Sequence, residues 1–204
     1  MQRVIPDNCA DVLVSDEGRA VLVGPATHAE LPRLAPGTLI RGLRIEPYAI
    51  RTVFGVDADE LTDRTLPLDA VLGSRAARVL ADAVWRPCAA DLRAALPDSS
   101  PDRATVGVVR ALTAPSTRSV DAIADRTGYS ARHLRRLVRA ETGLSPKALH
   151  RVARLQEFLR RAERGTPVSA AAAAAGYADQ PHATREVRAL TGLTPRSLLA
   201  ERAG

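Results

Sequence analysis

The sequence predicts an α+β fold, in which a small β-rich domain precedes an all-α domain of two helix-turn-helix units joined by a long helix. Three observations lead to this prediction. β-type runs fill the beginning of the chain, a break rich in Pro and Ser lies near its middle, and a helical unit occurs twice after the break. The 204 residues are enough for one large domain or two small ones.

The first strands are predicted as a hairpin. Residues 11–14 and 20–23 are rich in Val and Leu and flank the turn Asp16-Glu17-Gly18, which is typical of two paired strands. Residues 38–46 alternate between apolar and polar side chains and predict a third strand. Three apolar side chains share one of its faces: Leu39, Leu43 and Ile45.

Two helices are predicted to follow these strands. Pro47 opens a short helix that ends at Gly55, since Pro is favoured in the first turn of a helix and Gly directly after the last. A longer helix follows Ser74. Its predicted apolar stripe consists of Ala76, Val79, Leu80, Ala83 and Val84.

The break between the halves lies between Leu96 and Asp102, where prolines, serines and acids separate two segments with apolar periodicity. We therefore expect a first domain over residues 1–96, a linker over 97–101 and a second domain over 102–204.

Charge differs sharply between the two halves. Residues 1–100 carry 11 Arg against 14 Asp and Glu, a net charge of −3, whereas residues 101–204 carry 18 basic against 9 acidic side chains, a net charge of +9. This asymmetry indicates a second half that meets a polyanion. The alternative is a solvated basic face, because Arg replaces Lys at all but one position of the chain.

Composition argues against several other classes. No apolar run reaches the roughly 18–20 residues of a membrane span, and residues 1–6 lack the apolar stretch of a signal peptide, so a cytoplasmic, nucleoid-associated protein without a membrane partner is expected. Two cysteines, Cys9 and Cys88, cannot form a four-thiolate zinc site. The first half has one histidine, His28, so we expect no metal, no cofactor and no enzyme activity. Cys9 is either a buried structural thiol or a nucleophile.

An internal repeat fills the second half. Residues 128–146 recur as residues 176–195, each copy beginning with Gly-Tyr and ending with Thr-Gly-Leu-Ser/Thr-Pro. Counted back from the second Gly, four side chains match at an offset of 49 residues: His133, Arg136, Val138 and Arg139 match His182, Arg185, Val187 and Arg188. One supersecondary unit is therefore present twice.

Each copy has the pattern of a helix, a turn with Gly, and a second helix. In the first copy Ser130 occupies an N-cap position and Leu134, Leu137 and Val138 face the core, which leaves the arginines outside. In the second copy Asp179 is the predicted cap. A bracing helix followed by a helix that lies in the major groove is the arrangement of helix-turn-helix proteins. His133 and His182 are expected to pack or cap rather than to bind a metal.

A helix over residues 146–163 is predicted to join the copies. Its buried stripe is Leu149, Val152, Leu155, Phe158 and Leu159. Eighteen residues span roughly 27 Å at about 1.5 Å per residue, which allows two recognition helices to reach successive major-groove segments on one DNA face. The arginines of this helix form a solvated face or contact phosphate: Arg151, Arg154, Arg160 and Arg161.

Over about residues 102–202 the chain resembles the DNA-binding domain of AraC/XylS-type transcription regulators. The motifs that carry the resemblance are residues 128–136 (Gly-Tyr-Ser-Ala-Arg-His-Leu-Arg-Arg), 141–146 (Glu-Thr-Gly-Leu-Ser-Pro), 176–182 (Gly-Tyr-Ala-Asp-Gln-Pro-His) and 193–195 (Leu-Thr-Pro). By position, the resemblance implies DNA contacts from the first recognition helix through Arg132, Arg135 and Arg136. It implies contacts from the second through Gln180, Pro181, Thr184 and Arg185.

The same resemblance implies a sequence-specific regulator with double-stranded DNA and RNA polymerase as partners, together with a small-molecule effector and a homodimer formed through the first half. Two departures stand out. Val138 and Val187 replace the large aromatic usual in the family, and the brace of the second copy, residues 170–175, is all alanine. We expect the second unit to be less stable or to read DNA less tightly.

The first half resembles, with less specific motifs, a cupin-related sensor domain. Residues 4–11, 42–47 and 55–61 carry this resemblance, which begins in mid-domain and implies a truncated sensor. Two alternatives to a sequence-specific regulator follow: an interaction protein that pairs with and modulates a longer regulator, and a nonspecific nucleoid protein that binds through its basic half.

Overall fold

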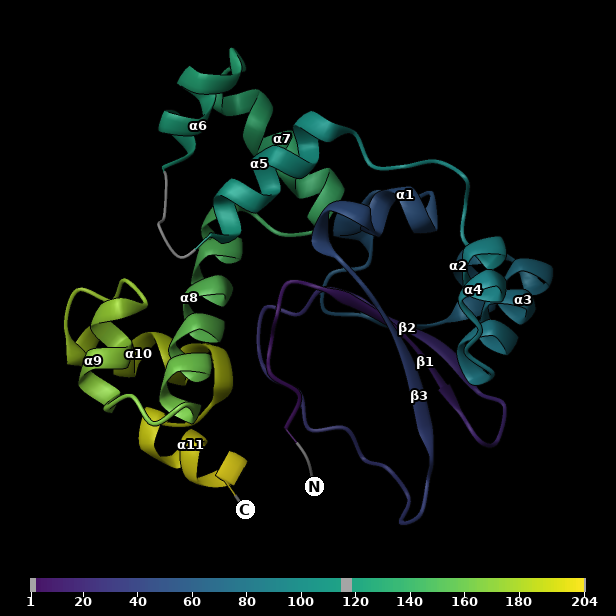
Figure 1. Ribbon diagram of the computed structural model, residues 1–204, viewed down its shortest axis with the longest axis horizontal. Helices are drawn as coiled ribbons and strands as arrows, with labels where there is room; N and C mark the ends of the chain where they lie inside the picture. The colour runs from purple at the N-terminus through teal and green to yellow at the C-terminus, as the bar shows by residue number, and fades with distance from the viewer. Residues whose placement is uncertain (1–2, 115–118, 204) are drawn as a thin grey trace.

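The computed structural model describes residues 3–114 and 119–203. It has the α+β layout that the sequence predicts, with a small antiparallel sheet and short helices in the first half and helices in the described part of the second (Figure 1). The two ends of the chain lie near each other, where the Arg3 Nε is 3.1 Å from the Glu201 Oε1.

The sheet has four strands in the order β3-β1-β2-β4. The predicted hairpin is confirmed: β1 (Ala10–Ser15) pairs antiparallel with β2 (Ala20–Val23). Gly18 closes it with a φ of 79°, a left-handed conformation that suits glycine. The outer strands are β3 (Ile40–Ile45), beside β1, and β4 (Thr65–Pro67), beside β2.

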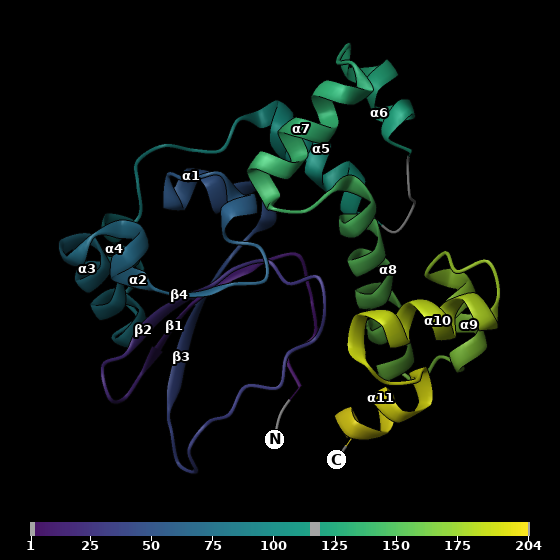
Figure 2. The same ribbon diagram turned by 180° about the vertical axis from the view of Figure 1, so that it is seen from behind.

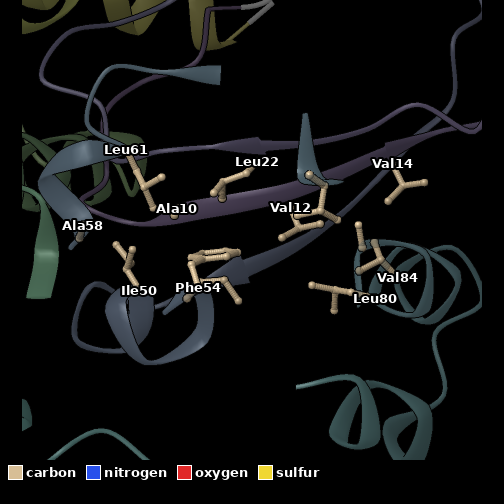
Figure 3. Packing of buried hydrophobic residues seen from close by; sticks show 13 residues of the cluster. Ala10, Val12, Val14, Leu22, Ile50, Phe54, Ala58, Leu61, Leu80 and Val84 are labelled. Atoms are coloured by element: carbon tan, nitrogen blue, oxygen red, sulfur yellow. The ribbon is translucent and has the colours of Figure 1, made fainter. Parts of the chain in front are cut away.

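Short helices cover one face of this sheet and enclose the core of the first half. Val12 and Leu22 of the central strands are fully buried on this face. Phe54 of α1 (Ile50–Phe54) and Leu80 of α3 (Ser74–Trp85) pack against it (Figure 3). The remaining short elements are η1 (Pro47–Ala49), η2 (Ala58–Glu60), α2 (Leu68–Leu72) and α4 (Ala89–Ala95).

Three side chains predicted to lie in this core are exposed instead: Ala76, Val79 and Leu39. Val79 is 50% exposed, because the buried stripe of α3 runs through Ala77, Leu80 and Val84, which are spaced by three and four residues. Leu39 is 52% exposed and lies just before β3, where its carbonyl accepts a hydrogen bond from the Asp16 amide.

The second half contains seven helices within the described ranges. They are α5 (Arg103–Thr113), α6 (Val120–Thr127), α7 (Ala131–Thr142), α8 (Pro146–Glu163), α9 (Val168–Ala174), α10 (Gln180–Thr191) and α11 (Pro195–Ala203). The long joining helix has the bounds expected from the sequence, and all five residues of its predicted stripe are buried.

Two separate hydrophobic cores meet on α8. Leu149, near its start, packs with α5, α6 and α7, whereas Leu155 and Phe158, further along, pack with α9, α10 and α11. Figure 2 shows the two groups of helices at opposite ends of α8. Each helix-turn-helix unit therefore has its own core, and α8 is the element that the two cores share.

We expect Leu155→Ala to lower the free energy of unfolding by about 2–5 kcal/mol, because Leu155 is completely buried and its truncation leaves a cavity in α8's second core. Urea unfolding followed by circular dichroism measures this change. The matched control is Leu34→Ala, since Leu34 is 57% exposed and should change the free energy by less than about 0.5 kcal/mol. Equal effects of the two substitutions would contradict this packing.

Candidate nucleic-acid interface

The first recognition helix, α7, begins at a well-formed cap. Gly128 ends α6 with a φ of 70°, which turns the chain, and the Ser130 hydroxyl accepts a hydrogen bond from the His133 amide at 3.2 Å. Ser130 is therefore the N-cap that the sequence predicts. This start fixes which side chains of α7 face outward.

The three arginines predicted to contact DNA lie on the outer surface of α7. Arg132, Arg135 and Arg136 are all exposed, while Leu134 and Val138 are buried on the opposite side. Arg135 lies 3.9 Å from Asp121 of α6, but both side chains are more than half exposed, so this pair is weak. Within the described ranges, Arg132 and Arg136 form no ion pair.

The second recognition helix, α10, repeats this geometry. Asp179 Oδ1 accepts a hydrogen bond from the His182 amide at 2.6 Å and is the predicted N-cap. Gln180, Pro181 and Arg185 are exposed. Thr184 differs from its neighbours, because it is half-buried and its hydroxyl donates to the Gln180 carbonyl at 3.0 Å.

The two equivalent histidines pack beside the turns, as expected. The His133 ring lies 4.8 Å from the Tyr129 ring, and the His182 ring meets the Tyr177 ring edge-on at 5.6 Å. His182 Nδ1 also accepts a hydrogen bond from the Ala178 amide. Both residues therefore shape the turn that presents each recognition helix.

Two of the α8 arginines, Arg151 and Arg154, are largely covered and have partners on α10, whereas Arg160 and Arg161 lie on a half-exposed face. Arg151 and Arg154 lie 2.8 Å and 3.6 Å from the Glu186 carboxylate of α10, and Arg154 also lies over the ring of Tyr177 at 5.5 Å. Burial raises the pKa of Tyr177 to about 12, so its ring stays neutral beneath the cation. These contacts tie α10 to α8.

Glu157 gathers the other two arginines of this helix. Its carboxylate is only 3% exposed and is paired with both Arg160 and Arg161. A buried carboxylate requires such partners, since an unpaired buried charge is costly. Together with the Glu186 pairs, this gives each of the four arginines a carboxylate partner.

The ties at Glu186 reinforce the second unit. Its brace, α9, buries Ala171, Ala172 and Ala175, which offer little apolar surface. The ion pairs of Glu186 with Arg151 and Arg154 also hold α10 against α8, and they add to the small apolar contact area of the alanine helix.

One groove lies between the two halves of the chain, with a volume of about 400 Å³. Its walls come from the first half and from helices α5 and α8. Polar side chains prominent in its lining are Asp7, Glu46, Tyr48, Arg110, Gln156 and Glu157. No local pattern in the sequence predicts this groove, because its walls come from distant parts of the chain, from Asp7 to Arg160.

The remaining candidates of the first half show no catalytic arrangement within the described ranges. His28 is exposed and lies 3.5 Å from Asp63, and no group of three potential metal ligands is found among the described residues. Burial, together with the nearby Asp7 carboxylate, raises the pKa of the Cys9 thiol to about 12. A protonated thiol is a poor nucleophile, which favours the structural alternative for Cys9.

Comparison with known families agrees with this geometry in the second half. Residues 123–201 match a family model described as a helix-turn-helix domain, and this range includes both α7 and α10. Residues 1–67 match a family described as a domain of unknown function (DUF6597). Searches of curated proteins and of solved structures found no match.

Residues 123–201 therefore form a DNA-binding domain of the kind found in AraC-type transcription regulators, as the resemblance of the sequence implied. The match over residues 1–67 carries no function, so a cupin-related sensor remains a prediction. None of the described helices combines the length and the apolar character that crossing a bilayer requires.

The two thiols should differ in reactivity. We expect Cys88, which is exposed, to react quickly with a disulfide reagent at pH 8, and Cys9, half-buried with its raised pKa, to react much more slowly. Absorbance of the released thiolate follows both phases. Cys88→Ser should remove the fast phase alone, whereas a fast phase that persists in this variant would refute the assignment.

Proposed function

We propose that the protein is a sequence-specific transcription regulator that places α7 and α10 in successive major-groove segments of its DNA site. The observation that carries the proposal is duplication: two equivalent helices, capped in the same way, each present exposed basic and polar side chains at their beginning. The contacting residues of this proposal are Arg132, Arg135, Arg136, Gln180, Pro181, Thr184 and Arg185.

The spacing of the two helices supports this mode of binding. α8 has 18 residues and spans roughly 27 Å at about 1.5 Å per residue. One turn of B-DNA measures about 34–36 Å, so helices held at opposite ends of α8 suit two neighbouring groove segments. A general helical bundle would not need a long shared helix between two separately packed units.

The proposal divides the chain into a first domain of residues 1–96, a linker of residues 97–101 and a DNA-binding domain of residues 102–204. The extended stretch between α4 and α5 supports this division. The first domain would be the regulatory one. A small-molecule effector in the groove between the halves would touch both of them, because Tyr48 and Gln156 line the same space.

Further partners follow from the role of a regulator. RNA polymerase would be the protein that the DNA-bound chain recruits or blocks. A second copy of the chain would pair with the first through the first domain, so that a homodimer binds two adjacent copies of the DNA site. Chromosomal DNA as the main partner places the protein on the nucleoid in the cytoplasm.

Salt dependence tests DNA binding by this protein. We expect log K for duplex DNA to fall linearly with log salt, with a slope of about −0.9 per phosphate contact and roughly 6–10 contacts, because arginine neutralisation releases counterions. Fluorescence anisotropy on a duplex selected from a random pool measures K. A slope near zero would remove the proposal, and the absence of any selected sequence would leave nonspecific nucleoid binding as the function.

Arg136 and Arg185 occupy equivalent positions, so their alanine variants should each lose preference at a different part of the site. Each bidentate contact to guanine is worth about 1–3 kcal/mol of discrimination. The two affected positions should lie about one helical turn apart. Selection from random DNA with each variant measures this, and Arg78→Ala, which changes an exposed side chain of α3, is the control. If both variants relax the same base pairs, the two-groove arrangement is wrong.

A further inference from the structure

We infer that the first half of the chain positions the two recognition helices for DNA, because it binds the equivalent turn at the end of each one. This inference rests on the proposed function, in which both helices read DNA together. The first half is then part of the DNA-binding apparatus in a mechanical sense, although it supplies no contact to the bases.

The turns that end α7 and α10 are nearly identical in structure. Gly143 and Gly192 end the helices with φ values of 74° and 77°. In each, the preceding threonine hydroxyl donates to a carbonyl four residues earlier at 2.7 Å and accepts from the following leucine amide at 3.2 Å; these threonines are Thr142 and Thr191. Such turns leave several helix carbonyls available to other donors.

The first half supplies a donor to the turn after α7. The Thr62 hydroxyl donates to the Gly143 carbonyl at 2.8 Å. The packing here is so close that a Cβ atom on Gly143 would lie 2.5 Å from the Thr62 Oγ1 and 2.7 Å from the Ala58 carbonyl oxygen. Two ion pairs flank this contact, Arg51 with Glu141 at 3.1 Å and Asp59 with Arg139 at 3.3 Å.

The first half also supplies donors to the turn after α10. The Ala29 amide donates to the Leu190 carbonyl at 2.7 Å, and the Arg3 guanidinium donates to the Thr191 carbonyl at 2.9 Å. Arg3 is held in place by Glu201 of α11 at 3.1 Å. Both recognition helices thus end on the same domain.

Between these two turns the first half also binds α8 itself. The Asn8 side-chain amide donates to the Leu149 carbonyl at 3.3 Å, and the Gln156 side-chain amide donates to the Pro6 carbonyl at 2.6 Å. The two units have separate cores that meet on α8. The first half therefore closes a ring from α7 through α8 to α10, and this ring limits how the units can turn about α8.

The docking leaves the predicted DNA-reading side chains free. The first half contacts the carboxyl ends of α7 and α10, whereas Arg132, Arg136 and Arg185 lie toward their amino ends and are exposed. Contact with the first half and contact with DNA are therefore compatible. The docking holds α7 and α10 in a fixed relative orientation before DNA binds. Less conformational entropy is then lost when both helices bind one duplex.

Gly143→Asn tests the inference, because asparagine tolerates the left-handed conformation while its side chain would push Thr62 and Ala58 away. Gly55→Asn is the matched control: Gly55 ends α1 in the same left-handed conformation, with a φ of 71°, and a Cβ there meets nothing within 4 Å. A second, milder pair is Thr62→Val, which removes the hydroxyl, and Thr62→Ser, which keeps it.

The readout is the Kd for two duplexes. One duplex is selected from a random pool by the wild-type chain and carries both half-sites. The other keeps the half-site bound by α7 and has the half-site bound by α10 scrambled. We expect Gly143→Asn to bind the complete duplex about tenfold more weakly than wild type, with a smaller loss for Thr62→Val. Gly55→Asn and Thr62→Ser should match wild type, and all variants should bind the scrambled duplex alike.

Other outcomes overturn the inference. Equal affinities of Gly143→Asn and Gly55→Asn for the complete duplex would show that the docking has no effect, and tighter binding by Gly143→Asn would show that the first half restrains the units. An equal loss on both duplexes would mean damage to the first unit alone. If the wild-type chain selects no duplex, the proposed function fails, and urea unfolding then tests the docking by itself. One unfolding transition in wild type and two in Gly143→Asn would support the docking. The same number of transitions in both would overturn it.

Discussion

The helical half depends on one constraint, the sharing of α8 by two hydrophobic cores. Leu149 belongs to the first core and Leu155 and Phe158 to the second, all on one stripe of a single helix. A helix that buries one stripe against two units cannot rotate under one unit without disturbing the other. The orientation of α7 relative to α10 is therefore set by side-chain packing along α8 and by the links that cross it.

Several of the links across α8 are ion pairs, so the net charge of the second half does not show how many arginines are already paired. The second half carries a net charge of +9, yet six of its arginines are engaged with carboxylates of the same half, including Arg151 and Arg154 with Glu186. The pairs of Arg151 and Arg154 with Glu186, and of Arg202 with Glu163, join different helices. Among the described residues, Arg132, Arg136 and Arg185 on the two recognition helices have no acidic partner and remain available to a polyanion.

Local features of this fold could be predicted from the sequence because their signals are local. A cap such as Ser130 acts on an amide three residues away, Gly18 marks its own turn, and the stripe of α8 follows from residue spacing alone. The duplication was visible for the same reason, since both copies carry the same residues at the same spacing. Exposure on α7 and α10 followed from the periodicity of the buried positions.

Contacts between distant segments could not be predicted in this way. Thr62 and Gly143 are 81 residues apart, and Arg3 and Thr191 are 188 apart, so no periodicity relates them. Glu186 is paired with Arg151 and Arg154, which lie more than 30 residues earlier in the chain, so its role depends on how α10 packs against α8. The exposure of Val79 has the same origin, because the side of α3 that meets the sheet is decided by tertiary packing.

The polarity of the helices explains why the two kinds of partner use opposite ends of α7 and α10. A helix has free carbonyls and partial negative charge at its carboxyl end, and free amides with partial positive charge at its amino end. Donors of the first half, the Thr62 hydroxyl and the Arg3 guanidinium, meet the carboxyl ends. The amino ends, with their free amides, suit phosphate and base acceptors, and the exposed Arg132, Arg136 and Arg185 lie in the first halves of the two helices. Protein and DNA are thus complementary to different ends of the same two helices, so each helix can hold both at once.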